Sequence, residues 1–136
     1  MLDNIRVEDV LFLDIETVPD APSHELLDQS MKILWEKKSK HFRLPEQTGN
    51  DVYERAGIYA EFGKIICIST GFISSRSDRK TFRVKSFFGD DEKEILICFC
   101  DLLNKYYYRD EHMLCAHNGK EFDYPYIARR GLINGL

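Results

Sequence analysis

The chain has 136 residues, of which 43% are hydrophobic and 31% charged, and its formal net charge is −4. This composition is typical of a folded protein and excludes a disordered or fibrous one, and the length predicts a single domain. The negative charge argues against a broad basic surface for nucleic acid, because such affinity comes from Lys and Arg neutralising phosphates. Near the start the longest apolar run is only Val10 to Leu13. We therefore expect no signal peptide, no membrane span and a cytoplasmic location.

The first predicted strand runs from Val10 to Glu16. It is apolar on both faces, which is typical of a central strand in a sheet covered on both sides. A helix is expected from Ser23 to Lys40, and a shorter one from Val52 to Tyr59. These helices would form an insertion, at about residues 21–62, between the first and second strands.

Two antiparallel strands are expected next, at Lys64 to Ser74 and Lys80 to Phe88, because both segments are rich in β-branched and aromatic residues. The polar residues between them predict a hairpin connection. Asp91 and Glu94 have the spacing of a capping box, which predicts a helix from Asp91 to about Tyr108.

The last predicted elements are a short strand from Met113 to Ala116 and a helix that begins near Asp123. Pro125 would lie in the first turn of this helix, and Gly135 would end it. Because the preceding helix returns the chain by a crossover, the first and fourth strands should be parallel neighbours. The fold class is therefore predicted to be α/β with a mixed sheet: three antiparallel strands, then helix, parallel strand, helix.

Two carboxylates end the first predicted strand. Asp14 and Glu16 are two positions apart, so both side chains leave the same face. Paired carboxylates repel each other, and a hard cation such as Mg²⁺ or Mn²⁺ relieves that repulsion. The alternative is that the strand simply reaches the surface there and both acids lie in water.

A third carboxylate, Asp123, follows the fourth predicted strand. Parallel neighbouring strands place their carboxyl ends side by side, which would bring Asp123 toward Asp14 and Glu16. The alternative is that Asp123 is an ordinary N-cap, accepting hydrogen bonds from the first turn of the last helix.

Two segments resemble the motifs of a known enzyme family. Phe12 to Thr17 (FLDIET) is similar to the first motif of the DEDD 3′→5′ exonucleases, and Asn118 to Asp123 (NGKEFD) resembles the second. The continuation through Ile127 is similar to the F-D-x-P-Y-I form of family-B DNA polymerase proofreading domains, and the nearest group is the stand-alone bacterial type. The resemblance implies a ribonuclease H-like core.

The resemblance also implies residue roles. Asp14, Glu16 and Asp123 would be catalytic and would hold two Mg²⁺ or Mn²⁺ ions for phosphodiester hydrolysis. The expected substrate is the 3′ end of single-stranded DNA, with RNA left open. Three residues match positions that contact the terminal nucleotides: Thr17, Asn118 and Phe122. A plain core position is the alternative for Phe122.

The third motif of the family, Y-x-x-x-D or H-x-x-x-D, does not follow Asp123. Its two formal matches, His24 to Asp28 and Tyr106 to Asp110, precede the second motif, and we interpret both as chance. The last strand and helix of the family fold are therefore expected to be lacking, and this chain alone is expected to be weak or inactive. The exposed fourth strand would then favour self-association.

Other interpretations remain for several features. A nuclease fold that binds nucleic acid or a partner without cutting is the main alternative function. A haloacid-dehalogenase-like phosphatase does not fit, because its D-x-D-x-T spacing is not matched. The four cysteines form no C-x-x-C pair and are expected to be reduced thiols. A basic, aromatic stretch at Trp35 to Arg43 is predicted to be a solvated helix face, with a path for phosphates as the alternative.

Overall fold

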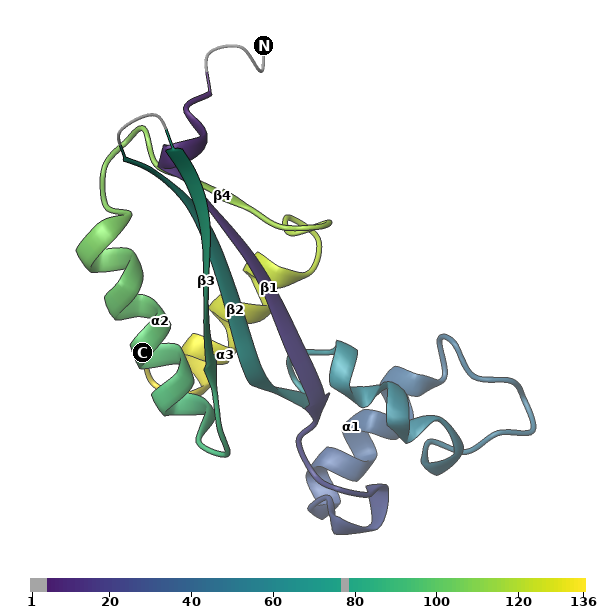
Figure 1. Ribbon diagram of the computed structural model, residues 1–136. Coiled ribbons are helices and arrows are strands. Elements are labelled where there is room, and N and C mark those ends of the chain that lie inside the picture. Colours follow the sequence, from purple (N-terminus) through teal and green to yellow (C-terminus); the bar gives the residue numbers. More distant parts are fainter. Residues whose placement is uncertain (1–4, 77–78) are drawn as a thin grey trace. The chain divides into compact units, whose positions relative to one another are not determined.

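The computed structural model describes residues 5–76 and 79–136, and the chain divides into two compact units (Figure 1). The first, called here the sheet unit, comprises Met1–Glu16 and Ile65–Leu136. The second, called the inserted unit, comprises Thr17–Lys64, and the insertion predicted at about residues 21–62 falls within these bounds. Within the described part of the chain, no helix has the length and apolar character needed to cross a membrane.

The sheet has four strands in the order β3-β2-β1-β4. Strands β2 and β3 are antiparallel, and β1 and β4 are parallel, as predicted. The side chain of Ser75, near the end of β2, donates to Glu8, just before β1, which shows that these two strands also run in opposite directions. The coarse prediction of an α/β fold with a mixed sheet is confirmed. The strand bounds are Val10–Pro19 for β1, Gly63–Arg76 for β2, Arg79–Phe88 for β3 and Met113–Cys115 for β4.

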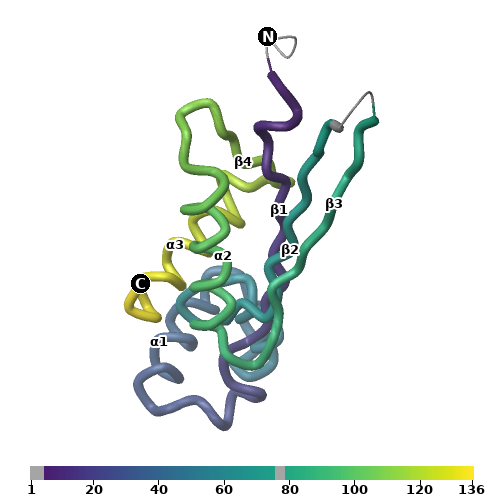
Figure 2. Tube along the Cα trace, turned by 60° about the vertical axis from the view of Figure 1, so that its left-hand side comes forward, coloured from purple at the N-terminus to yellow at the C-terminus, as the bar shows by residue number. Residues whose placement is uncertain are grey.

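Helices α2 (Glu92–Tyr106) and α3 (Asp123–Ile133) complete the sheet unit and lie on the same side of its sheet (Figure 2). Helix α2 begins as predicted, because the Asp91 carboxylate accepts a hydrogen bond from the Glu94 N–H at 3.2 Å. Pro125 lies in the first turn of α3, where its missing N–H removes no helical hydrogen bond.

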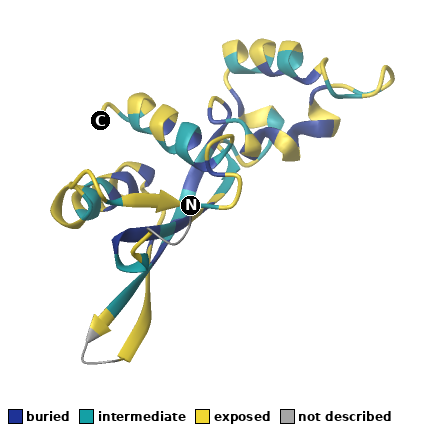
Figure 3. Cartoon of the chain, turned by 90° about the horizontal axis from the view of Figure 1, so that it is seen from above, coloured by how far each residue is buried: buried dark blue, intermediate teal, exposed yellow. Residues whose placement is uncertain are grey.

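The two faces of the sheet differ, which departs from the expectation of a strand covered on both sides. In β1 the odd-numbered residues Leu11, Leu13 and Ile15 are buried, whereas Asp14 and Glu16 on the other face are exposed. Strand β3 is exposed along nearly its whole length (Figure 3). The apolar run of β1 is therefore buried mainly on the face that α2 and α3 cover, and on the other face only its first residue, Val10, is buried.

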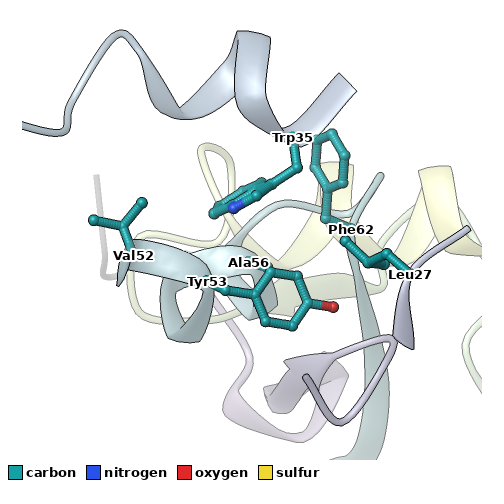
Figure 4. Close-up of a cluster of buried hydrophobic side chains, with 6 residues drawn as sticks. All are labelled: Leu27, Trp35, Val52, Tyr53, Ala56 and Phe62. Atoms are coloured by element: carbon teal, nitrogen blue, oxygen red, sulfur yellow. The ribbon is translucent and has the colours of Figure 1, made fainter. Parts of the chain in front are cut away.

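The inserted unit has a hydrophobic core of its own (Figure 4). Trp35 is completely buried at its centre and donates from Nε1 to the carbonyl of Gly49 at 2.7 Å. Trp35 thus serves the core and is not exposed for stacking on bases. Six buried side chains form this core: Leu27, Trp35, Val52, Tyr53, Ala56 and Phe62.

The helix predicted from Ser23 to Lys40 begins later than expected. The structure has a single 3₁₀ turn, η3 (His24–Leu26), and then α1 (Gln29–Ser39). Asp28 provides the reason, because its carboxylate accepts hydrogen bonds from the Met31 N–H at 2.9 Å and the Ser30 hydroxyl at 2.6 Å. The short helix predicted near Val52 is present as a 3₁₀ helix, η4 (Asn50–Ile58).

Candidate active site at the end of β1

Strand β1 continues beyond its short partner. The parallel pairing of β1 with β4 ends at Phe12 and Cys115, so in the described part of the chain the following residues of β1 have no strand beside them on that edge. Asp123, at the start of α3, takes up this position: its carboxylate accepts a hydrogen bond from the Ile15 N–H. The first and second motifs therefore meet through a backbone-to-side-chain contact.

The second motif folds as a tight turn between β4 and α3. Asn118 has the positive φ of 54° that asparagine tolerates better than most residues, and its carbonyl accepts from the N–H groups of Glu121 and Phe122. A Cβ at Gly119 would lie 2.7 Å from Ala116 Cβ and 2.8 Å from the Tyr124 ring. Asparagine and glycine at these two positions let the chain reverse closely enough for α3 to begin at Asp123.

Asp123 is the first residue of α3 and only 2% exposed. The N-cap position is Phe122, so the interpretation of Asp123 as an N-cap is wrong. Burial raises the pKa of the Asp123 carboxyl, and the negative charge of Asp14 raises it further. The backbone N–H groups of Asp123 and Ile15 and the nearby His117 act in the opposite direction, but the pKa remains above its ordinary value.

One oxygen of this carboxylate, Oδ1, is buried and has no hydrogen-bond partner among the described residues. A buried acceptor without a partner costs about 1–3 kcal/mol, and more if it is charged. A hard cation held by Asp123 and Asp14 would satisfy this oxygen and cancel the repulsion between the two acids. The two side chains therefore fit a divalent metal.

Asp14 is near enough to Asp123 for its charge to raise the pKa of that carboxyl, but a three-carboxylate group is not assembled among the described residues. Within residues 5–76 and 79–136, no three His, Cys, Asp or Glu side chains are grouped so that they could hold a metal ion. Glu16 is exposed on the same face of β1 as Asp14. Its joining the other two carboxylates stays a prediction.

The three predicted substrate contacts occupy different environments. Asn118 is exposed at the turn before α3, and Phe122 is partly buried with its ring 5.4 Å from that of Tyr126. Thr17 is partly buried and directly follows Glu16, in the segment of β1 that belongs to the inserted unit. Their roles in binding a nucleotide stay predictions.

An aromatic pair that the sequence did not single out lies on the same face as Asp14. Phe12 is two positions before Asp14 in β1, and its ring lies 6.2 Å from that of Phe82 in β3. The Phe82 ring reaches Phe12 because it crosses over Gly71 in β2, where any Cβ would collide with it. Phe82 remains 60% exposed. A glycine inside a predicted strand was the only local signal of such a close approach.

The two formal matches to the third motif have other local roles. Asp28 caps α1 in the inserted unit with its carboxylate. Asp110 is exposed in the loop between α2 and β4, and Tyr106 before it is 58% exposed at the end of α2. These positions are consistent with chance matches.

Comparisons of the chain with protein-family models, with curated proteins and with solved structures gave no match. The resemblance to the DEDD exonucleases therefore rests on the two motifs.

Proposed function

We propose that this chain carries part of the active site of a metal-dependent 3′→5′ exonuclease with a ribonuclease H-like core. The observation that supports this most is the buried Oδ1 of Asp123, which lacks a partner among the described residues and lies in a carboxylate repelled by Asp14. These acids come from the two segments that resemble the exonuclease motifs. The substrate we propose is the 3′ end of single-stranded DNA, with RNA as the second possibility.

In this proposal Asp14, Glu16 and Asp123 hold Mg²⁺ or Mn²⁺. When bound, two such ions activate water and stabilise the leaving oxygen in phosphodiester hydrolysis. The Ile15 N–H fixes the orientation of the Asp123 carboxylate. Glu16 is exposed, so its side chain can change rotamer toward the metal without disturbing the core.

The rings of Phe12 and Phe82 provide a surface for the bases next to these acids. A ring stacks on any base, which suits an enzyme that removes nucleotides regardless of sequence. Asn118 and Phe122 would contact the strand from the turn before α3, and Thr17 from the end of β1. Of the rings of Phe12, Phe82 and Phe122, that of Phe82 is the most exposed, and it is in contact with the Phe12 ring.

The first test is metal binding, measured as the rise in thermal stability of the whole chain on titration with Mn²⁺. A ligand that binds only the folded state at ten times its Kd stabilises it by about 1.4 kcal/mol. We expect this rise in the unmodified chain and its loss in Asp14→Asn and Asp123→Asn. The matched control is Asp110→Asn, which removes an exposed carboxylate of the loop before β4. If Mn²⁺ stabilises Asp123→Asn as much as the unmodified chain, the proposal is wrong.

The second test is release of nucleotides from a 3′-labelled single-stranded oligonucleotide. The 136 residues supply three of the four carboxylates that the resemblance implies, so we expect slow release that Asp14→Asn abolishes. Positioned acid–base groups contribute about 10² to 10⁴ in rate, which sets the expected deficit relative to a complete site. Rapid release that depends on Asp14 would mean that another acid of this chain completes the site.

The alternative is a nuclease-like module that binds nucleic acid or a partner without cutting it. The observation that favours it is the lack, in the described part of the chain, of a three-residue metal group. Oligonucleotide binding that is unchanged by Mn²⁺ and by Asp14→Asn would support this alternative over the exonuclease.

A further inference from the structure

A cleft of 680 Å³ lies between the β2–β3 hairpin and the C-terminal end of α2. The cleft is on the face of the sheet that α2 covers. Tyr106 of α2 lines it together with Phe72 and Arg83, which are paired across β2 and β3 and so extend from the same face. Asp14 and Glu16 point from the opposite face. The cleft is therefore separate from the candidate active site, and its ligand is independent of the proposed function.

Cations dominate the charge of this cleft. Arg83 and Lys85 are two positions apart in β3, so both extend from the same face, and Arg109 approaches from the loop after α2. Among the described residues the only acid in the lining is Glu8, which already binds Lys80 at 3.6 Å and the Ser75 hydroxyl at 2.6 Å.

The two β3 cations have no carboxylate partner among the described residues. Lys85 Nζ instead lies 4.6 Å from the centre of the Phe87 ring, and Arg83 takes part in no ion pair of the described chain. In a chain with a net charge of −4, two neighbouring cations without acid partners among the described residues favour the binding of an external anion.

Arg109 is held in position. Its guanidinium Nη2 lies 3.0 Å from His112 Nε2, its Nη1 lies 3.7 Å from Glu111 Oε1 in an exposed ion pair, and the His112 ring packs 5.2 Å from that of Tyr107. A planar guanidinium fixed in this way is suited to bidentate binding of a phosphate, because less side-chain entropy is lost when the ligand arrives.

Three aromatic rings also line the cleft: Phe72 from β2, and Tyr106 and Tyr107 at the end of α2. Tyr106 is 58% exposed, which leaves a ring available to a ligand. An inorganic anion would need only the cations. Rings beside cations fit a ligand that has both a flat aromatic group and a phosphate.

We propose that this cleft binds a nucleotide, with the phosphate at Arg83, Lys85 and Arg109 and the base against Tyr106. The nucleotide is either free or one residue of a single-stranded nucleic acid, since both offer the same chemistry. Strand β3 places Arg83 and Lys85 on one face, and His112 holds Arg109.

The test compares three ligands by titration calorimetry with the whole chain: AMP, inorganic phosphate and an oligothymidylate of about 12 nucleotides, long enough to span a typical single-strand site. The double variant Arg83→Glu/Lys85→Glu should weaken AMP binding by about a hundredfold or more, since two charge-assisted hydrogen bonds are lost. The control Lys93→Glu/Arg129→Glu makes the same change in net charge at exposed positions outside the cleft and should bind AMP as before. Circular dichroism of both variants establishes that they fold.

A second variant tests the ring. Tyr106→Ala should weaken AMP and oligothymidylate by about tenfold, the usual loss for one stacked base, and leave phosphate unchanged. Tighter binding of oligothymidylate than of AMP assigns the cleft to a strand, and equal binding assigns it to a free nucleotide. Phosphate binding as tightly as AMP, or equal AMP affinity in both double variants, would overturn the proposal.

Discussion

Each end of α3 carries a buried charged side chain, and the two side chains differ in the partners that surround them. Near its C-terminal end, Arg130 is 7% exposed and binds both oxygens of Glu92 in α2, at 2.8 Å from Nε and 2.5 Å from Nη2. Asn134 and the Ile65 N–H complete the hydrogen bonding of Glu92. At the N-terminal end, Asp123 is buried beside another acid and keeps one oxygen without a partner in the described chain.

The carboxyls of Glu92 and Asp123 have pKa values shifted in opposite directions. Burial alone would raise the pKa of both. For Glu92 the hydrogen bonds from Arg130, Ile65 and Asn134, together with the Arg130 charge, outweigh burial and hold its pKa below the ordinary range. For Asp123 burial and Asp14 prevail and raise the pKa. One end of α3 is therefore built for stability, and the other retains an unfavourable charge that a bound cation would relieve.

The largest expected effect is at the satisfied end. Glu92→Gln removes the carboxylate that binds the buried Arg130 guanidinium through two nitrogens, so the free energy of unfolding should fall by about 3–5 kcal/mol. Urea unfolding at neutral pH measures this. Glu94→Gln, an exposed position of the same helix, is the control and should change stability by less than about 0.5 kcal/mol. Equal effects would show that the Glu92–Arg130 pair does not hold α2 to α3.

At the other end, removing the charge should stabilise the protein. Asp123→Asn eliminates a buried charge and its repulsion with Asp14, so without metal at neutral pH the free energy of unfolding should rise by about 1 kcal/mol. The same urea experiment measures it. Asp110→Asn, where the carboxylate is exposed, should have no such effect. A loss of stability in Asp123→Asn would mean that the carboxylate is satisfied.

The pH dependence sharpens the comparison further. The pKa of Asp123 is raised in the folded state, so the folded chain binds more protons than the unfolded chain between about pH 4, the ordinary value, and the raised pKa. The contribution of Asp123 is present below that window and is lost as pH rises through it. The stability of the unmodified chain relative to Asp123→Asn should therefore fall with rising pH. A difference that is constant with pH would contradict the raised pKa.

The smallest effect concerns the strand that leads into the N-terminal end of α3. Strand β4 forms an edge of the sheet, as predicted, and Met113 and Leu114 are 37% and 42% exposed. Edge strands with exposed apolar side chains pair with other chains. We expect weak, concentration-dependent self-association in sedimentation, reduced by Leu114→Lys and unaffected by Lys93→Glu. A monomer at all concentrations would contradict this.

The sequence by itself determined the order of the strands and helices, the parallel pairing of β1 and β4, and the common face of Asp14 and Glu16. These follow from local periodicity and from the crossover made by α2, both of which are read along the chain. Where two local signals competed, the sequence alone could not determine where the helix begins. Ser23 and Asp28 are both good N-caps, and the helix begins after Asp28 because its carboxylate binds the Met31 N–H.

Only the tertiary structure decided how the charges are matched. Glu92 and Arg130 are 38 residues apart, and no pattern in the chain indicates that they pair. The same holds for the ring of Phe82 that crosses Gly71 to Phe12, and for the oxygen of Asp123 that has no partner in the described chain. Such contacts depend on where packing places distant side chains, and burial then determines whether each charge stabilises the fold or is left for a ligand.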